Sequence, residues 1–203
     1  MENNIVFSGF SDLARDSQAS FRATMDAMAH PGKIVDAPIQ VKAPAPLTPT
    51  TAMLVLTLCD FDSPLWLDQE LAANQQVRQF IAFHTSAPIV ENKADAQFAL
   101  ISDIKELENT RSFALGTDEY PDRSTTLITQ VSALSNQDGV TLTGPGIEFS
   151  TQLNVANLKA AFWAQAQANS QLFPRGVDFI FATQTQLACL PRSIKINAKS
   201  EAA

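Results

Sequence analysis

Ionisable side chains follow apolar runs at several places in this sequence. Asp60 and Asp62 stand two residues apart after one such run. Two carboxylates at this spacing could bind Mg²⁺ beside the phosphates of a nucleotide. Alternatively, Asp62 opens a turn into Ser63, because Asp readily hydrogen-bonds its own backbone in turns. His84 could donate a proton or contact a phosphate, or it could complement the dipole at the C-terminal end of a helix.

Three arginines are the natural anion-binding groups of the chain, namely Arg22, Arg175 and Arg192. Arg192 follows an apolar run, so its guanidinium could face a cleft or form a structural salt bridge. Because loops at strand ends form the usual crevice of an α/β sheet, we expect Asp62, His84 and Arg192 to lie near one cleft. The candidate ligand-binding residues are Asp62, His84, Thr85, Gly146, Arg192 and Arg22.

A glycine-rich segment and two further residues have a functional and a structural interpretation each. Gly144–Gly146 resembles half of a dinucleotide-binding loop, but position 149 is Phe where a third glycine would stand. Pro145 also removes one N–H donor from any anion site, so a plain turn is the alternative. Trp66 could pack in the core or stack on a base. His30 stands before Pro-Gly at a helix end, where a structural role is expected.

Several reaction classes find no support in the sequence. No G-x-S-x-G segment is present for a hydrolase nucleophile. The two histidines and two cysteines have no zinc-ligand spacing. Cys59 and Cys189 each adjoin an apolar run, which predicts inert buried thiols, with a reactive thiol as the alternative. We therefore expect no catalytic residue, no metal and no cofactor in this chain.

Composition limits the partners and the location. The chain has 203 residues, of which 45% are hydrophobic, enough for one sizeable core. Its net charge of −7 disfavours a nucleic-acid partner, which needs a basic face. Residues 1–4 lack the positive start of a signal peptide, and no apolar run approaches the ~18 residues of a membrane span. Two isolated cysteines suit a reducing compartment, so we expect a cytoplasmic protein without membrane contact.

The apolar pattern predicts a single α/β domain over residues 1–203, with helices on both faces of a three-layer mixed sheet. Asp16 is expected to cap the first helix, in which Phe21, Met25 and Met28 share one face. Residues 136–139 are expected to form a hairpin turn. The expected helices are 16–29, 50–58 capped by Thr50, 74–84, and 154–170 capped by Asn154, with a short helix or turn at 103–109. The expected strands are 64–67, 89–90, 97–101, 125–133, 140–143, 177–182 and 187–190, between an N-terminal arm (1–15) and a frayed tail (197–203).

Seven pieces of the chain, in this order and at these spacings, carry a family resemblance that no single piece would establish. Together they resemble the H subunit of the carbon–phosphorus lyase system, the PhnH family of alkylphosphonate utilisation. The pieces are 20–22 with 27–32, 58–67, 83–88, 116–121, 142–147, 173–178 and 190–192.

The resemblance implies a fold similar to the large domain of pyridoxal-phosphate-dependent transferases, but without their cofactor lysine. The sequence agrees on that point, because its lysines stand in turns, on polar helix faces or near the terminus. The resemblance further implies a non-catalytic or helper subunit, acting with the G, I and J subunits, that helps exchange the adenine of ATP for methylphosphonate. A homodimer is expected when it is isolated. The alternative is an independent nucleotide- or phosphonate-binding protein with its own polar cleft.

Overall fold

The computed structural model describes residues 8–197, apart from the side chain of Glu108. Its centre is a seven-stranded sheet in the order β1-β9-β8-β5-β4-β2-β3. The five strands from β8 to β3 run parallel, whereas β9 is antiparallel to β8 and β1 is antiparallel to β9. The strands are β1 (Val35–Asp36), β2 (Leu65–Leu67), β3 (Ile89–Val90), β4 (Phe98–Ile101), β5 (Thr126–Gln130), β8 (Asp178–Ala182) and β9 (Gln186–Leu190).

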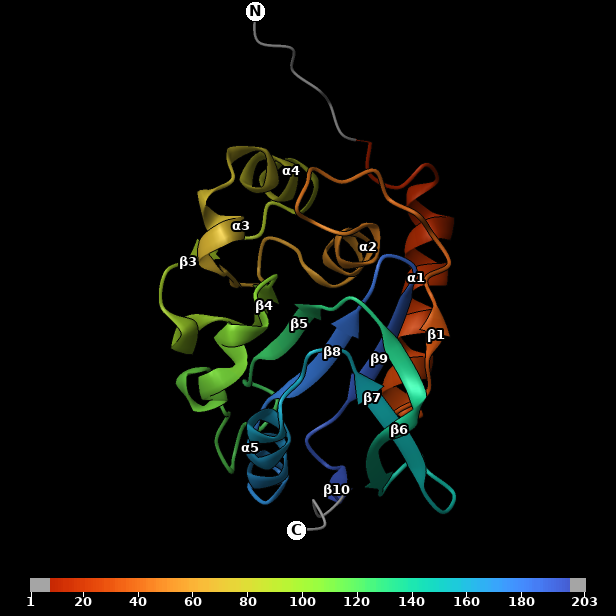
Figure 1. Ribbon diagram of the computed structural model, residues 1–203. Helices are drawn as coiled ribbons and strands as arrows, with labels where there is room; N and C mark the ends of the chain where they lie inside the picture. Colours follow the sequence, from red (N-terminus) through yellow and green to blue (C-terminus); the bar gives the residue numbers. More distant parts are fainter. Residues whose placement is uncertain (1–7, 198–203) are drawn as a thin grey trace, which may run out of the picture.

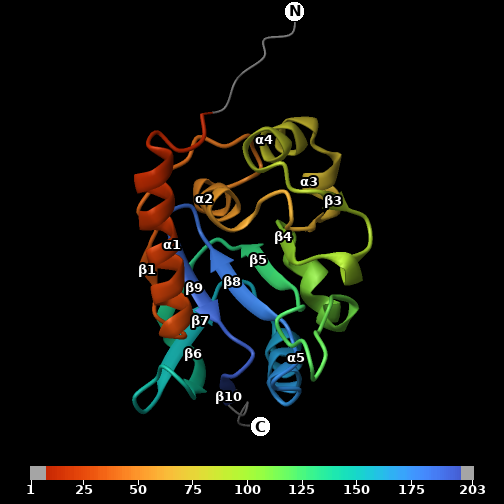
Figure 2. The same ribbon diagram turned by 180° about the vertical axis from the view of Figure 1, so that it is seen from behind.

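Helices cover one face of this sheet, and a mixed layer covers the other (Figures 1 and 2). The first face carries α1 (Leu13–Ala29), α2 (Pro49–Leu58), α3 (Gln69–Ala73) and α4 (Gln75–Thr85). The second face carries α5 (Ala160–Ser170), the 3-10 helix η2 (Ile104–Ser112) and a three-stranded antiparallel sheet. That small sheet has the order β10-β6-β7 and consists of β6 (Leu134–Thr143), β7 (Thr151–Val155) and β10 (Lys195–Asn197); a short 3-10 helix, η1, spans Lys93–Asp95.

Alternating side chains of the central strands pack into two separate hydrophobic cores, one on each face of the sheet. In β8, Ile180 belongs to the core under the helices α1 to α4, and Phe181 belongs to the core under α5 and the small sheet. In β2, Trp66 faces the second core, where it makes an edge contact with Phe113 at a centroid distance of 5.5 Å. Because successive side chains of a strand point to opposite faces, both faces of the sheet must be covered. Trp66 is 9% exposed and therefore a core residue.

Several expected elements are present. The helix expected at 74–84 is α4, and Asn74 caps it by accepting hydrogen bonds from the backbone N–H groups of Gln76 and Val77. The strands expected at 64–67, 89–90, 97–101, 177–182 and 187–190 are β2, β3, β4, β8 and β9. For α2, the expected cap was wrong by two positions, because the Thr48 hydroxyl accepts from the Thr51 N–H.

The expected start of the first helix was wrong, and its expected apolar face lies only partly against the core. Asp12 caps α1, so residues 13–15 belong to the helix and not to an arm. The carboxylate of Asp16 instead folds back and accepts hydrogen bonds from the N–H groups of Ser11 and Asp12, and the latter bond lowers the pKa of Asp16. The buried side chains of α1 are small or polar, and Met28 packs partly buried against the same core, whereas Phe21 is 48% exposed and Met25 is 38% exposed. Close packing of α1 on α2 and β9 favours the small stripe.

The segment from 134 to 159 also differs from expectation. Residues 136–139 do not turn, because β6 runs through them with a shift of register against β7 between Ser135 and Val140. A Cβ on Gly139 would lie 2.2 Å from the backbone of Leu153, so the glycine permits the two strands to approach in a bulge. The hairpin loop is instead 144–150. Asn154 lies in β7, and the last helix begins only at Ala160.

The termini fall partly outside the described residues. Residues 1–7 of the expected arm and 198–203 of the expected tail are not described, and Asn197 is the last residue of β10. Within residues 8–197, no helix is long and apolar enough to cross a lipid bilayer.

Candidate functional site

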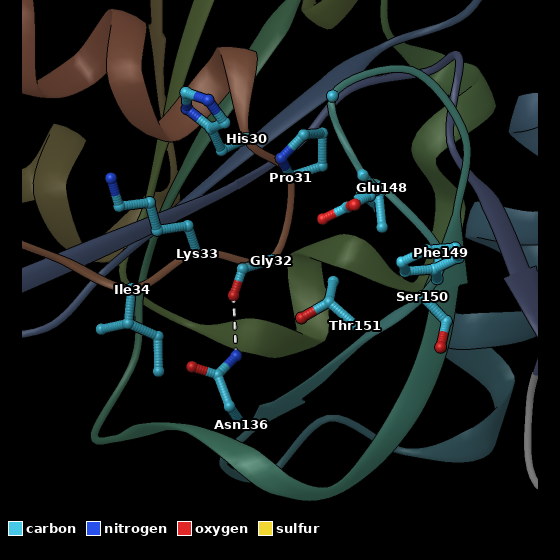
Figure 3. Close-up of a pocket in the computed structure, with 12 residues that line it drawn as sticks. His30, Pro31, Gly32, Lys33, Ile34, Asn136, Glu148, Phe149, Ser150 and Thr151 are labelled. Carbon is cyan, nitrogen blue, oxygen red and sulfur yellow. Dashed lines mark hydrogen bonds between the residues drawn. The ribbon is translucent and has the colours of Figure 1, made fainter.

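A surface hollow of about 460 Å³ lies where the C-terminal end of α1 meets the tip of the β6–β7 hairpin (Figure 3). Its walls come from two segments far apart in sequence, residues 30–34 and residues 146–151, with Asn136 between them. Both segments include pieces that carry the family resemblance. Two of those pieces, far apart in the sequence, therefore lie side by side at the hollow.

The contact between the two walls depends on glycine. A Cβ on Gly146 would lie 2.0 Å from the carbonyl oxygen of Ala29, and Gly146 has a φ of +81°. The hairpin tip can therefore rest on the end of α1 only with glycine at this position. Asn136 also joins the two segments, since its amide donates to the carbonyl of Gly32 at 2.8 Å and to that of Gln152 at 2.6 Å.

The rim of the hollow carries charges of both signs. Asp26, one turn before the end of α1, accepts a hydrogen bond from Lys33 at 2.7 Å and lies 2.9 Å from the ring of His30. The hydrogen bond from Lys33 lowers the pKa of the Asp26 carboxyl. All three side chains are more than a third exposed, so solvent screens these pairs. They fix the shape of the rim more than they stabilise the fold.

The hollow offers groups for binding. Lys33 and His30 can donate hydrogen bonds, Ser150 and Thr151 carry hydroxyls, and the ring of Phe149 is 83% exposed. Within residues 8–197, no three His, Cys, Asp or Glu side chains come together in a way that could hold a metal ion. The arrangement can therefore hold a polar ligand or a segment of a partner protein through hydrogen bonds and ring stacking.

Gly146 is the one predicted candidate that lines the hollow. Its structural alternative is also correct, because Gly144 to Ile147 forms a turn closed by a backbone hydrogen bond of 3.1 Å. Arg22 lies exposed on α1 and makes no ion pair with any residue in the 8–197 range.

Asp62 lies exposed in the turn between α2 and β2. Asp60, not Asp62, builds that turn: its carboxylate accepts from the Asp62 N–H at 2.9 Å and from the Ser63 hydroxyl at 2.8 Å. The expectation that Asp62 opens the turn was therefore wrong by two positions. The expected interaction, an aspartate carboxylate that hydrogen-bonds within the turn, is nevertheless present at Asp60.

His84 and Thr85 end helix α4. The His84 ring is half-buried and packs against Phe80 and Phe83, with centroid distances of 4.7 and 5.0 Å. Gly9 passes so close that a Cβ there would lie 2.8 Å from the imidazole. The Thr85 hydroxyl donates to the carbonyl of Ile81 at 2.8 Å and accepts from the Ala87 N–H at 3.1 Å. These contacts describe a structural helix end.

Arg192 forms the most enclosed ion pair of the described residues. Its guanidinium binds both carboxylate oxygens of Asp178, and the two side chains are 13% and 18% exposed. It also donates to the hydroxyl of Ser124 and, at 2.8 Å, to the carbonyl of Pro121. The alternative of a structural salt bridge therefore fits Arg192, which joins the β9–β10 connection to the starts of β8 and β5.

Three pieces of the family resemblance converge around this pair. The N–H of Gly176 donates to the carbonyl of Leu115 at 2.8 Å, and Arg175 pairs with Asp118 at 3.1 Å. Residues 116–121, 173–178 and 190–192 thus form one cluster at the amino ends of β5 and β8. The neighbours of Asp62, His84 and Arg192 come from different parts of the chain, and none of the three lines the hollow. Their shared cleft stays a prediction.

The crevice that open α/β sheets usually use for ligands is filled by a side chain that the sequence did not single out. After β2 the chain continues to its neighbour β3, and after β4 it continues to β5, on the opposite side of the β4–β2 pair. Ligands commonly bind at the carboxyl ends of two such adjacent strands. Asp68 lies there, 1% exposed, and its carboxylate accepts from the N–H groups of Leu71, Ser102 and Asp103 at 3.0, 2.6 and 2.9 Å. The Asp68 carboxylate therefore occupies the three backbone N–H donors that could otherwise bind an anionic ligand.

The hollow contains two residues for which the sequence predicts no binding role. Its pattern predicts a structural role for His30 at a helix end and a turn position for Lys33. Two Pro-Gly steps, at Pro31 and Pro145, were the available signal, because each marks a sharp loop that could bring its neighbours to a surface. Only their contact in the fold shows that the two loops adjoin.

The mixed sheet with helices on one face and a mixed layer on the other defines an α/β domain. The sequence matches the PhnH family, described as a bacterial phosphonate metabolism protein, over residues 8–197. It is 37% identical over 192 residues to the "Alpha-D-ribose 1-methylphosphonate 5-triphosphate synthase subunit PhnH" of Rhizobium meliloti (strain 1021), covering 94% of this chain and 96% of that protein. It is 30% identical over 182 residues to HtxG of Stutzerimonas stutzeri, which carries the name of a C–P lyase subunit protein, covering 90% of this chain and 86% of HtxG. The chain belongs to the PhnH family, which confirms the resemblance carried by its motifs.

Proposed function

We propose that this protein is a subunit of the complex that makes α-D-ribose 1-methylphosphonate 5-triphosphate, the step in which methylphosphonate replaces the adenine of ATP. The observation that carries the proposal is the 37% identity to a subunit of that synthase over 94% of this chain and 96% of the relative. Coverage this complete on both sides means that the whole domain is shared. The second relative, named as a C–P lyase subunit protein, supports the same phosphonate pathway.

The proposed role is that of an accessory subunit without its own catalytic set. The partners are the G, I and J subunits, the location is the cytoplasm, and the isolated chain is a homodimer. A fold like the large domain of pyridoxal-phosphate-dependent transferases, without the cofactor lysine, is part of this proposal. In support, Lys93 is the only lysine of residues 8–197 that is not exposed, and its ammonium is engaged. It pairs with Glu106 at 2.8 Å and lies 4.7 Å from the centroid of the Trp66 ring.

Genetic complementation tests the proposal directly. A Rhizobium meliloti strain that lacks its own PhnH subunit would receive this chain and be grown with methylphosphonate as the only phosphorus source. We expect growth to return, and we expect lysates without this chain to form no ribose methylphosphonate triphosphate. Normal expression and folding without restored growth would count against a shared role, with growth on inorganic phosphate as the control for viability.

The hollow favours a second candidate function, a protein that binds ATP or a phosphonate by itself. Lys33 and His30 at its rim could contact phosphate oxygens, and Phe149 could stack on a base. Calorimetric titration of the isolated chain with ATP and with methylphosphonate distinguishes the candidates. Micromolar binding that Lys33→Ala abolishes and Lys42→Ala leaves unchanged supports the binding protein, since Lys42 is an exposed lysine outside the hollow.

A further inference from the structure

Two large apolar side chains of helix α1 point outward. Phe21 and Met25 are 48% and 38% exposed, and they form what we call the apolar ridge of α1. Helix α1 lies along one side of the molecule, at the outer edge of the helical layer (Figures 1 and 2). Phe21 and Met25 are one helical turn apart, so their side chains are neighbours on the same surface.

The inner stripe of α1 shows that this orientation is fixed. Ser20, Thr24 and Ala27 are completely buried against the rest of the fold, and the Thr24 hydroxyl donates to the carbonyl of Ser20 at 2.8 Å. Small side chains let α1 lie close to α2 and β9, and a rotation that buried Phe21 would place a large ring there. The ridge therefore stays outside in the isolated chain. An amphipathic helix that points its apolar side chains to solvent is typical of an interaction surface.

Two arginines run beside the ridge. Arg15 and Arg22 are both exposed and stand seven residues apart, which is two helical turns and hence one line along the helix. Within residues 8–197 neither forms an ion pair, although Arg15 lies near enough to Asp16 to help lower its pKa. Asp26, one turn after Arg22, is already paired with Lys33, so the two arginines leave the outer face of α1 locally cationic on a protein whose net charge is −7.

We propose that the outer face of α1 is the docking surface for another subunit of the complex, and that the docking segment is apolar with carboxylates along its edge. The inference rests on the proposed function and adds the surface and the chemistry of the partner. Phe and Arg are frequent at the centres of protein interfaces, where a few such side chains supply most of the binding energy. Carboxylates on the partner would meet the line of Arg15 and Arg22.

Charge argues against a second copy of this chain as the occupant. A two-fold contact brings the same surface of each copy together. Both copies would then bring unpaired arginines to one contact, whose nearest carboxylate, Asp26, is already held by Lys33. A partner with acidic edges removes this repulsion, so the homodimer proposed for the isolated chain uses a different surface.

The test is capture of the other subunits by the tagged full-length chain, expressed together with them, over a series of chain concentrations. The disrupting variant is Phe21→Glu with Met25→Glu. The matched control is Phe83→Glu, because Phe83 is 76% exposed on α4, away from α1. We expect half-maximal capture to need on the order of 30-fold more of the disrupting variant, the factor that corresponds to a hot-spot loss of about 2 kcal/mol. The control is expected to capture like the wild type.

A second variant keeps the test decisive if the first one folds poorly. Arg15→Glu with Arg22→Glu leaves the apolar ridge intact and reverses the charge beside it, so it is expected to weaken capture and to remove part of its sensitivity to salt. Unchanged capture by both double variants would overturn the inference while wild-type capture still supports the proposed function. Failure of the wild type to capture any subunit would refute the proposed function instead.

Two other results would also overturn the inference. If the disrupting variant turned a wild-type dimer into a monomer and kept full capture, the occupant would be a second copy. If the wild type bound vesicles of phosphatidylcholine with anionic phosphatidylserine, and the variant lost only this binding, the occupant would be a membrane surface.

Discussion

Replacing Arg192 should decide whether that arginine is structural or functional. Arg192→Met keeps most of the side chain's volume but removes the guanidinium that binds both carboxylate oxygens of Asp178. The Asp178 carboxylate would then stay in a site where it is only 18% exposed, and the hydroxyl of Ser124 and the carbonyl of Pro121 would lose a donor.

The expected loss is large for a single substitution. Breaking a buried ion pair by removing one partner costs about 3–5 kcal/mol, and the remaining exposure of both side chains places this pair at the lower end. We therefore expect the free energy of unfolding to fall by about 3 kcal/mol. For a domain of this size that corresponds to a Tm lower by about 6–12 °C.

The assay is urea unfolding of both proteins, with equal slopes required for the comparison. Arg175→Met is the matched control, because Arg175 pairs with Asp118 in the same cluster but the side chains are 44% and 81% exposed. Such an exposed pair contributes about 0–1 kcal/mol. A loss below about 1 kcal/mol for Arg192→Met would refute the structural account. Normal unfolding combined with lost growth on methylphosphonate would give Arg192 a direct role in function.

His84→Ala should lower the free energy of unfolding by roughly 1–3 kcal/mol through lost packing on its neighbouring rings. A normal melt with lost growth on methylphosphonate would show a functional role for His84. A normal melt with normal growth would exclude both the structural and the functional role. Burial raises the pKa of the Cys59 thiol to about 12 and also raises that of Cys189, so we expect Ellman's reagent to label neither thiol in the native protein and both after unfolding. Asp16 and Asp26 have pKa values below the usual 3.8. Their stabilisation is therefore complete above pH 3.8 and lost as the pH falls toward the lower folded values, and Asp16→Asn should flatten this part of a stability profile.

Strands with strong local patterns were predictable from the sequence. Apart from Asp178, the run 177–182 is apolar with branched and aromatic side chains, and the turn that follows it at 183–185 is polar. The strands β8 and β9 were therefore expected close to where they lie. The helix α4 was predictable for the same reason, because Asn74 caps it and Val77, Phe80 and Ile81 recur at helical spacing. In these segments the local preference and the tertiary environment agree.

The errors lie where local signals have two solutions. Asp138-Gly139 suits a hairpin turn, but the same flexibility suits a bulge, and the approach of β7 selects the bulge. In α1, helical spacing identifies two stripes, and no local rule states which of them faces inward. The close fit on α2 and β9 selects the small residues Ser20, Thr24 and Ala27.

The sequence by itself determined the family, the presence of the main strands and helices, and the absence of a recognisable catalytic motif, because these depend on residues near one another or on an ordered set of short pieces. Tertiary structure alone decided that the loops at Pro31 and Gly146 meet in one hollow, that Asp68 fills the sheet crevice, and that Phe21 faces outward. Each of these facts depends on contacts between segments far apart in the chain. Such contacts follow from how the elements pack, and packing is a property of the whole fold.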